Sequence, residues 1–448
     1  MILSALKKLI PRPVFEFFQP TYHYLIGFLG ALTYGFPSKK LAVIGVTGTK
    51  GKSTTSYLIA QILEAAGYKT GMATTVLFKI GEKEWLNDTK QTMLGRFQLQ
   101  KLLKQMVKAG CRYAVIETSS EGILQYRHRF IDYNAAVFTN LTPEHIERHG
   151  GFENYRDAKV KLFEKVAGKP NSVGVYNFDD ENVSYFLKPE IENKYLYSLK
   201  LKKITGAIQN LYRITDVKST KNGTSFLFNN EKFEIPLIGE FNIYNAAAAI
   251  CAVLALGVPI EKIKKALLIT KAPPGRLEII NPSTRLRAGK GQNFTVIIDY
   301  AHEPSSLEAV YKTSLKLKFK NSKLICLLGA QGGGRDKWKR SAMGEIAAKY
   351  CDKIILTNED PYDENPLQII NDIESGFSQI RNPKFETRNL FKIIDRKEAI
   401  KKALSLAKKD DVVILTGKGG EVWMCVENGK KIPWDEKQII EELLYEKI

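Results

Sequence analysis

The sequence has few cysteines, fewer acidic than basic residues, and no apolar run long enough to span a bilayer. Its 448 residues include five cysteines, an odd number, and no two of them lie at the spacing of a metal clip. We therefore expect neither a disulfide framework nor a zinc ribbon, and a reducing compartment fits best. The cysteines are Cys111, Cys251, Cys326, Cys351 and Cys425.

The composition is typical of a globular protein. Hydrophobic residues make up 44% and charged residues 26% of the chain, which excludes a disordered or collagen-like protein. The 67 Lys and Arg residues exceed the 48 Asp and Glu residues, so the net charge is +19. Such an excess favours anionic partners, which include phosphates, nucleic acid and acidic lipid surfaces. At about 150 residues per domain, the length suggests about three domains.

The N-terminal 40 residues differ from the rest. Val14–Phe36 is rich in aromatic residues and has basic residues on both sides. Its uninterrupted part, Tyr24–Phe36, has 13 residues, fewer than the ~20 that a bilayer-spanning helix needs, and no small-residue cleavage site indicates a signal peptide. Two interpretations stay open: a helical arm packed on the body, and an interfacial anchor whose aromatic side chains lie at a lipid surface.

A glycine-rich loop between a predicted strand and a predicted helix indicates phosphate binding. The apolar run at 41–45 predicts a buried strand, and apolar residues at helical spacing follow the loop. Gly48 and Gly51 would let backbone N–H groups turn toward a polyphosphate. Lys52 would reach the terminal phosphates, and the Ser53 hydroxyl would bind Mg²⁺.

Acidic and histidine residues follow two further strands. The strand predicted at Tyr113–Glu117 ends in an acidic residue, which is a natural Mg²⁺ ligand in a nucleotide-binding fold. His145 and His149 have a glutamate between them, but not in the order of zinc proteases, and Pro143 favours the start of a helix. We therefore do not expect zinc-dependent hydrolysis.

Two later segments carry weaker signals. Asn242 and Asn245 lie at the start of an alanine-rich helix, where they serve either as caps or as contacts to a nucleotide base. Arg276 follows a Pro-Pro-Gly turn that ends the middle section. A second α/β pattern then begins, which predicts a separate doubly wound domain. Its strands are expected at 294–299, 323–329, 353–357 and 411–416.

The ordered motifs resemble those of the Mur ligase family. In the general phosphate loop the first glycine would stand at position 46, which is Val46 here. The first glycine of this loop is Gly45, one residue earlier, and that spacing resembles the family's own. The motifs cover about residues 41–430 in the family's order. The others are Thr139–His145, Ala158–Phe163, Gly275–Glu278, Asp299–Pro304, Gly333–Arg340 and Gly417–Glu421.

The resemblance implies an α/β fold, with a P-loop ATPase domain on a mostly parallel sheet and a C-terminal Rossmann-like ligase domain. We expect an apolar and basic arm at 1–38, the ATP-binding domain at 39–272 and the ligase domain at 273–448. It also implies ATP-dependent amide formation through an acyl phosphate, with release of ADP and phosphate. The motifs are most similar to the branch that adds the third peptide residue to a cytoplasmic, anionic muramyl-dipeptide precursor.

The same resemblance assigns roles to individual residues. Catalysis falls to Lys52, Glu117, His145 and Lys159. Two Mg²⁺ ions are expected, and their ligands would be Ser53, Glu117, His145 and, once carbamylated, Lys159. Nucleotide binding falls to Gly48, Thr49, Lys50, Gly51, Lys52, Ser53, Thr54, Asn245, Arg276 and Asp299. The donor substrate falls to Thr92, Ser119, Gln125 and Arg127. The acceptor amino acid falls to Arg335, Asp360, Pro361, Tyr362, Gly417 and Glu421.

The sequence departs from the family pattern in three respects, the third of which concerns two positions. Only the short arm precedes the phosphate loop, where the family has a UDP-binding domain, so we expect that domain to be lacking. Glu359–Tyr362 replaces Asp-Asn-Pro-Arg, and a tyrosine cannot clamp a distal carboxylate as arginine does, which favours a lysine-like or other diamino acceptor. Gly420 and Glu121 stand where the family often has histidine.

The same motifs bear on alternative functions. A Mur-like ligase acting on a lipid-linked, pseudomurein or other non-UDP acceptor fits the missing domain and the apolar arm. Folylpolyglutamate synthase is disfavoured because Ser53 directly follows Lys52, and a zinc-ribbon amidotransferase subunit is opposed by the cysteine spacing. Only the net charge supports a nucleic-acid-binding ATPase, so we expect no nucleic acid partner. We expect a cytoplasmic protein whose arm can contact the inner membrane face.

Overall fold

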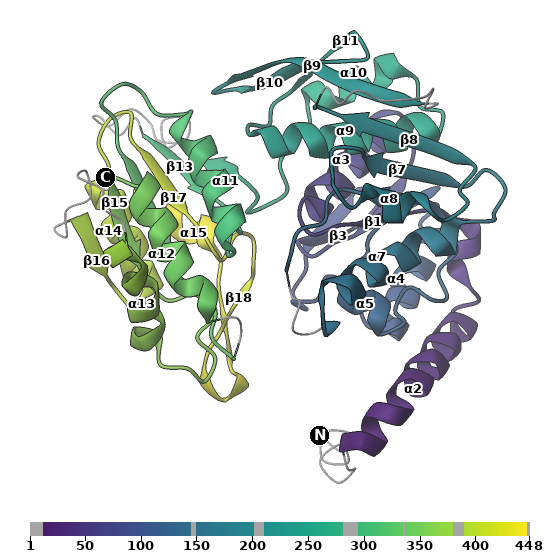
Figure 1. Cartoon of the computed structure of the whole chain (residues 1–448), viewed down its shortest axis with the longest axis horizontal. Coiled ribbons are helices and arrows are strands. Elements are labelled where there is room, and N and C mark those ends of the chain that lie inside the picture. The colour runs from purple at the N-terminus through teal and green to yellow at the C-terminus, as the bar shows by residue number, and fades with distance from the viewer. Residues whose placement is uncertain are drawn as a thin grey trace. The chain divides into compact units, whose positions relative to one another are not determined.

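The computed structural model describes residues 12–144, 149–200, 210–280, 294–334, 337–379 and 389–445, with side chains from Phe17 onward. The chain forms two compact units (Figure 1). The first consists of the chain up to Lys218 with residues 224–236 and 241–271. The second consists of residues 219–223, 237–240 and the chain from Ala272 onward. The domain limits expected from the sequence, 39–272 and 273–448, stay a prediction.

The first unit is built on an 11-stranded sheet whose middle section is parallel. The strand order is β11-β10-β9-β8-β7-β6-β1-β5-β2-β3-β4, and neighbours from β9 to β2 run parallel. The phosphate loop follows β1, which lies between β6 and β5. The strands are β1 Ala42–Thr47, β2 Thr70–Ala73, β3 Leu77–Ile80, β4 Lys83–Leu86, β5 Tyr113–Glu117, β6 Tyr133–Phe138, β7 Val173–Asn177, β8 Asn193–Ser198, β9 Leu211–Thr220, β10 Gly223–Phe228 and β11 Glu231–Ile235.

Helices cover this sheet and confirm the expected strand–loop–helix order. The helix after the phosphate loop ends just before Gly67, whose φ of 94° suits a chain reversal that other residues rarely adopt. Leu162 and Phe163 pack with Tyr133 and Phe138 in the core beneath the sheet. The helices are α3 Lys52–Ala65, α4 Arg96–Lys108, α5 Ser120–Leu124, α7 Phe152–Val166, α8 Val183–Leu187, α9 Glu240–Ala255 and α10 Ile260–Leu268.

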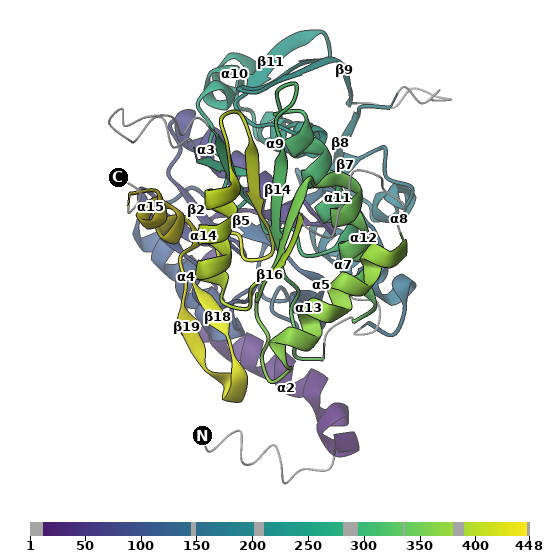
Figure 2. The same cartoon turned by 90° about the vertical axis from the view of Figure 1, so that its left-hand side faces the viewer.

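The second unit has its own six-stranded sheet, in the order β12-β13-β17-β14-β15-β16. Only β12 is antiparallel to its neighbour, so the α/β pattern predicted from the sequence is confirmed. A two-stranded ribbon of β18 and β19 adjoins it in sequence (Figure 2). The strands are β12 Glu278–Ile280, β13 Thr295–Ile298, β14 Leu324–Leu328, β15 Lys353–Leu356, β16 Leu390–Lys392, β17 Val412–Leu415, β18 Trp423–Cys425 and β19 Lys431–Pro433.

Helices also accompany this second sheet. α14 packs on three of its strands, β14, β15 and β17, and α15 packs on α14. Ile400 and Ala403 of α14 belong to the same hydrophobic core as Ile325 and Val413 of the sheet. The helices are α11 Pro304–Leu315, α12 Trp338–Tyr350, α13 Pro366–Glu374, α14 Arg396–Leu406 and α15 Glu436–Tyr445, with short 3-10 turns at Ser375–Gln379 and Glu427–Gly429.

The N-terminal arm is helical. Helix α2, Arg12–Thr33, is followed by a 3-10 turn at Pro37–Lys40 (η1), and both pack against α4. Tyr24 and Phe28 make edge contacts with the ring of Phe130, as the packed-arm interpretation predicts. Among the described residues, no helix is both long and apolar enough to cross a membrane.

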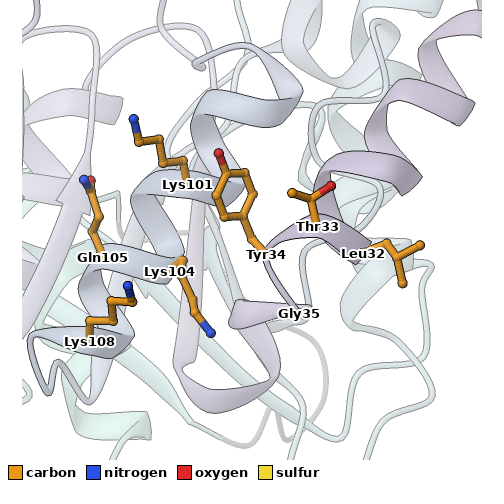
Figure 3. A pocket seen from close by; sticks show the side chains of 8 residues that line it. All are labelled: Leu32, Thr33, Tyr34, Gly35, Lys101, Lys104, Gln105 and Lys108. Atoms are coloured by element: carbon orange, nitrogen blue, oxygen red, sulfur yellow. The ribbon is translucent and has the colours of Figure 1, made fainter.

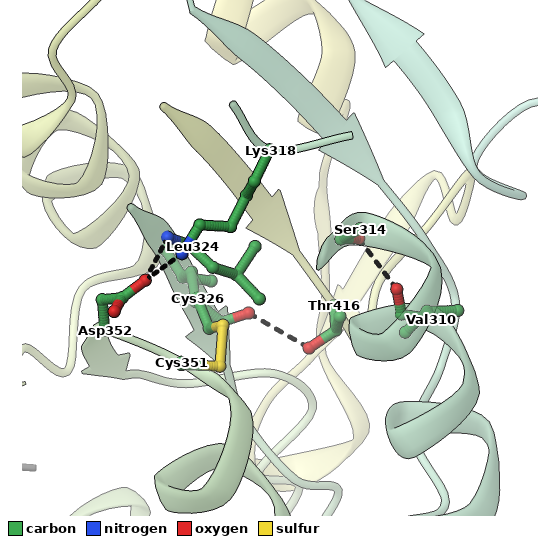
Figure 4. The surroundings of a disulfide bond; sticks show 9 residues. Val310, Ser314, Lys318, Leu324, Cys326, Cys351, Asp352 and Thr416 are labelled. Atoms are coloured by element: carbon green, nitrogen blue, oxygen red, sulfur yellow. Dashed lines mark hydrogen bonds and ion pairs between the residues drawn. A yellow bond between two sulfur atoms is a disulfide. The ribbon is translucent and has the colours of Figure 1, made fainter. Parts of the chain in front are cut away.

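The expectation of no disulfide is wrong for one pair of cysteines. Cys326 of β14 and Cys351, just after α12, form a disulfide with their Cα atoms 6.1 Å apart (Figure 4). They lie 25 residues apart in sequence, and only the β14–α12–β15 crossover brings them together. The other three cysteines are free and buried.

Candidate functional site

The carboxyl ends of β1 and β5 bring the predicted metal residues together. Because Val46 pairs in register with Glu117, the loop after β1 and the end of β5 share one edge of the sheet. The Ser53 hydroxyl, in the first turn of α3, donates a 2.8 Å hydrogen bond to Glu117 Oε2. Glu117 is only 2% exposed. A buried carboxylate beside a hydroxyl is the oxygen-only donor set that suits Mg²⁺.

Thr75, which the sequence analysis missed, positions this carboxylate. Its backbone N–H donates to Glu117 Oε2 at 2.8 Å, and its hydroxyl donates to Oε1 at 2.9 Å. The same hydroxyl lies 3.0 Å from that of Thr92, a predicted donor-substrate residue. Thr75 belongs to no motif, so no sequence signal pointed to it.

The glycines of the phosphate loop allow close approaches that a side chain would block. Gly48 has φ 147° and Gly51 has φ 80°. A Cβ on Gly48 would overlap the Thr139 hydroxyl, and one on Gly51 would overlap the Asn245 side-chain oxygen. Glycine is therefore required at both places for steric as well as conformational reasons.

The loop is held against the end of β6 by Asn140. The backbone N–H of Thr49 donates to the carbonyl of Asn140 at 2.8 Å, and that of Lys50 donates to its side-chain oxygen at 2.9 Å. The Lys50 carbonyl accepts from Thr139 and Asn140 side chains. Two of the N–H groups expected to face a phosphate are thus already paired. The first N–H groups of α3, which begins at Lys52 and includes Thr54, have no partner inside the helix and offer an anion site.

Two lysines approach the same loop from different elements. Lys52 Nζ donates to the Thr49 carbonyl at 2.7 Å. Lys159 Nζ, on α7, donates to the Gly48 carbonyl at 2.7 Å and lies 4.4 Å from the ring centre of Tyr155. Lys159 is 2% exposed. Burial, and next the charge of Lys52, hold the pKa of Lys159 well below its ordinary value.

The predicted donor-substrate residues lie beyond Glu117. The Ser119 hydroxyl caps α5 by accepting from the Gly122 N–H. Arg127 donates to Gln125 Oε1 at 2.7 Å and to Gln91 Oε1 at 2.8 Å. The structure brings Gln125 and Arg127 together directly, whereas Thr92 contacts Thr75, which in turn contacts Glu117.

The predicted adenosine residues fall in different units. Asn245, on α9, is 5% exposed, and its amide donates to Asn242 at 3.0 Å, so its oxygen faces the phosphate loop. In the second unit, Asp299 accepts from the backbone of Leu277 and Ala301, each at 2.7 Å. Burial raises the pKa of Asp299 although Arg276 opposes the shift. The Arg276 guanidinium also lies 4.3 Å from the ring centre of Tyr300.

Two of the predicted acceptor residues, Asp360 and Glu421, bind Lys418. Its ammonium donates to Asp360 at 2.9 Å and to Glu421 at 2.6 Å, and it is fully buried. Glu421 also accepts from the Tyr300 hydroxyl at 3.2 Å. Tyr362 has φ 52°, and its N–H donates to the Cys425 carbonyl. Lys418 and Tyr300 were missed as site residues although both stand inside quoted motifs.

Glu359 is the least expected group in this cluster. It is fully buried, and within the described residues neither of its carboxylate oxygens has a hydrogen-bond partner. Burial, and next the charge of Asp360, raise its pKa to about 7. A Cβ on Gly417, another predicted acceptor residue, would overlap this carboxylate.

Two predicted site residues cannot be placed. His145 and Arg335 lie outside the residues that the structure describes. Pro361, the remaining acceptor residue, packs its carbonyl against Gly332, where a Cβ would overlap it.

Comparison with known protein families gives two matches that together span most of the chain. Residues 46–253 match the Mur ligase middle domain, and residues 275–419 match the Mur ligase glutamate ligase domain.

Curated relatives match over nearly the whole chain. The UDP-N-acetylmuramoyl-L-alanyl-D-glutamate–2,6-diaminopimelate ligase 1 of Clostridium acetobutylicum is 39% identical over 424 residues, covering 93% of this chain and 81% of the relative. The UDP-N-acetylmuramyl-tripeptide synthetase of a Roseiflexus species is 36% identical over 443 residues, covering 95% and 82%.

Solved structures show the same similarity. A UDP-N-acetylmuramoyl-L-alanyl-D-glutamate–2,6-diaminopimelate ligase structure has TM-score 0.60 and 30% identity, covering 91% of this chain and 79% of its own. A Mycobacterium tuberculosis folylpolyglutamate synthase has TM-score 0.68 at 16% identity, covering 88% and 92%, which is a likeness of fold alone.

Proposed function

Because this chain belongs to the Mur ligase family, and is therefore an ATP-dependent, ADP-forming ligase, we propose that it is a tripeptide synthetase. It would join a diamino acid to a UDP-muramoyl dipeptide through an acyl phosphate, in the cytoplasmic stage of peptidoglycan synthesis. The lipid-linked and pseudomurein alternatives are not favoured by relatives that are named for UDP-linked substrates. We take residues 39–272 as the ATP-binding domain and 273–448 as the ligase domain.

The hydrogen bond between Ser53 and Glu117 is the observation that supports this function best. It brings a phosphate-loop hydroxyl to a buried carboxylate at the carboxyl edge of a parallel sheet. Phosphoryl transfer depends on positioned positive charge, which Mg²⁺ supplies when bound. These oxygens fit that ion, and Lys52 adds a fixed positive charge beside them. We propose Ser53 and Glu117 as Mg²⁺ ligands, together with His145, and two ions in the working enzyme.

Lys159 fits a carbamylated lysine. Carbamylation adds CO2 to a neutral amine and releases one proton, and burial with a neighbouring Lys52 charge keeps this amine neutral at a lower pH than an ordinary lysine. The product carries a negative charge, which would replace repulsion from Lys52 with attraction. We therefore propose that Lys159 is carbamylated and then joins the metal site.

The remaining roles follow the resemblance to the family's motifs. We propose that the phosphate loop, Asn245, Arg276 and Asp299 are nucleotide-binding residues. We assign the donor substrate to Thr92, Ser119, Gln125 and Arg127. We assign the acceptor to Arg335, Asp360, Pro361, Tyr362, Gly417 and Glu421.

The acceptor cluster supports a diamino acid. Relatives named for diaminopimelate favour that acceptor, and Tyr362, which carries no charge for a distal carboxylate, favours lysine. Both amino acids carry a distal ammonium group. The buried, unpartnered carboxylate of Glu359 is the group in this cluster that would pair with such a cation.

The test is phosphate release from ATP in the presence of UDP-MurNAc-dipeptide and single amino acids. Lysine, ornithine and meso-diaminopimelate form the test panel, and alanine and glutamate serve as controls. We expect ADP, phosphate and a new amide product with at least one diamino acid. Absence of phosphate release with every diamino acid would refute the assignment.

The location of the enzyme is part of the proposal. We propose a cytoplasmic enzyme whose N-terminal arm, residues 1–38, contacts a membrane surface.

A further inference from the structure

Helix α2 packs on the body with its small residues and exposes its large ones. Gly27, Gly30 and Ala31 are buried, with Gly30 against the backbone of Phe97 and Gly27 against the ring of Phe130. An amphipathic helix of a globular protein normally does the opposite. The exposed apolar side chains are Phe17, Phe18, Tyr22, Tyr24, Leu25, Phe28, Leu29 and Leu32, and the most exposed, Phe17, is 77% accessible.

These exposed side chains form one continuous face. Phe18, Tyr22, Leu25, Leu29 and Leu32 follow one another at steps of four and three residues, which places them along one side of the helix. In both views the N-terminal end of α2 extends beyond the rest of the first unit, to which α2 belongs (Figures 1 and 2). The rest of the first unit therefore leaves this face exposed. Another surface has to cover the face if its apolar area is to be removed from water.

A basic pocket lies where α2 ends. Its volume is about 500 Å³, and Leu32 to Gly35 line it together with α4 (Figure 3). From α4 come Lys101, Lys104 and Lys108, at helical spacing on one face. Within the described part of the chain, none of their ammonium groups has a hydrogen-bond or ion-pair partner. Helix α4 carries no acidic residue, and the exposed Lys39 and Lys40 of η1 pack beside it.

We propose that the outer face of α2 and the pocket of Lys101, Lys104 and Lys108 form a docking surface for an anionic phospholipid membrane. The inference rests on the proposed membrane contact of the N-terminal arm, and names the surface and the class of lipid. The apolar face enters the boundary between headgroups and acyl chains, and the pocket takes a headgroup phosphate. Apolar side chains beside a basic cluster give the two signals that stable peripheral binding needs.

Charge separates this occupant from a second copy of the chain. A paired helix with a seam at these spacings usually carries complementary charges beside the seam. From Phe17 to Phe36 the sequence contains no Asp, Glu, Lys or Arg. Basic residues instead lie at the two ends, at Lys7, Lys8 and Arg12 on one side, where Glu16 is the one acidic residue, and at η1 and α4 on the other. An apolar centre between basic ends matches the charge pattern of an anionic lipid surface.

The experiment is vesicle sedimentation of the full-length protein. Vesicles of phosphatidylcholine alone are compared with vesicles that contain about 30% phosphatidylglycerol, at the same total lipid concentration. We expect binding to the anionic vesicles, weakened as salt rises because exposed charges are screened. The variant K101Q/K104Q/K108Q should lose roughly fivefold in partitioning per lysine at low salt, on the order of 100-fold in total.

Matched variants keep the result interpretable. K316Q/K320Q/K409Q removes the same net charge from exposed lysines of the second unit and should change partitioning far less. L25Q/L29Q/L32Q should abolish binding, and each variant's circular dichroism melt should match that of the parent. Equal binding to both vesicle types, or an equal loss in the two lysine variants, would overturn the proposal. So would a dimer in sedimentation velocity that L25Q/L29Q/L32Q disrupts.

Ligase activity separates this inference from the proposed function. Measured without vesicles, amide formation should be unchanged in K101Q/K104Q/K108Q. Activity with no vesicle binding would overturn the docking surface alone, and vesicle binding with no activity on any diamino acid would overturn the proposed function alone.

Discussion

The hydroxyl of Ser53 donates a 2.8 Å hydrogen bond to the carboxylate of Glu117. Thr75 donates to the same carboxylate from its backbone and its hydroxyl. Three donors fix the orientation of one buried acid, so its oxygens point in defined directions before any ion arrives. Such preorganisation is what a catalytic metal site requires.

Loss of the Glu117 charge should therefore remove activity without unfolding the protein. We expect Glu117→Gln to lower kcat more than about 100-fold and to raise the Mg²⁺ concentration needed for half-maximal rate, because a neutral amide binds a hard cation poorly. Steady-state phosphate release across a Mg²⁺ titration measures both effects.

Thr75→Val tests the supporting bond, with Thr220→Val on β9 as the control. We expect Thr75→Val to lose roughly 10- to 100-fold in Mg²⁺ affinity, as is usual when a group that supports a metal ligand is removed. We expect no loss for Thr220→Val. Unchanged Mg²⁺ dependence in Glu117→Gln would contradict the metal assignment.

Lys159 should be replaceable in part by a small carboxylate. Lys159→Ala removes the amine that we propose to be carbamylated, so turnover should fall to background while ADP still binds. Added acetate or formate should restore part of the rate by supplying the missing anion. Lys161, exposed on the same helix, gives the matched control Lys161→Ala. Full activity in Lys159→Ala without added carboxylate would refute the assignment.

The sequence was sufficient to predict central strands of both sheets and the meeting of Ser53 with Glu117. The strands around residues 41–45, 113–117 and 353–357 are apolar runs, because strands of a parallel sheet are buried on both faces. The predicted edge of the sheet then brought Ser53 and Glu117 together. Motif positions also predicted that Asp360, Gly417 and Glu421 gather in one cluster, although their roles stay proposals.

The sequence did not predict contacts made by residues without a motif. Thr75 reaches Glu117 across 42 positions, and a lone threonine carries no pattern that indicates it. Asn140 pairs with the loop N–H groups that were expected to face a phosphate. Cys326 and Cys351 meet only through a crossover in the second sheet, so their spacing could not reveal a pair.

The Cys326–Cys351 disulfide should stabilise the second unit. Closing a loop of 25 residues is worth about 3.5 kcal/mol in the chain-entropy model. We expect oxidised protein to lose about this much unfolding free energy on adding dithiothreitol, measured by urea denaturation. The unfolding free energy of Cys326→Ser should be lower than that of the oxidised parent by a similar amount, and reductant should not change it. If the parent protein were equally stable with and without reductant, the bond would have no structural role.

Glu359 should make stability depend on pH in a direction opposite to that of most carboxylates. Its pKa is raised from 4.5 to about 7 by burial and by Asp360, although Arg396, Lys418 and Lys339 oppose the shift. Between these pH values the folded protein binds a proton that the unfolded chain releases. The unfolding free energy therefore falls as pH rises through this window, by about 3 kcal/mol from this group.

Glu359→Gln should remove that dependence because the amide cannot ionise. We expect the variant to be more stable than the parent at pH 8 and similar to it at pH 5, in urea denaturation at both values. Glu427→Gln, an exposed control in the same unit, should follow the parent at both. The contrary result is an unfolding free energy that rises from pH 5 to pH 8 by the same amount in the parent and in Glu359→Gln. That result would show that Glu359 is ionised at a normal pKa. In that case its carboxylate would have to be paired, and the acceptor cluster would have no buried acid left to meet a distal ammonium.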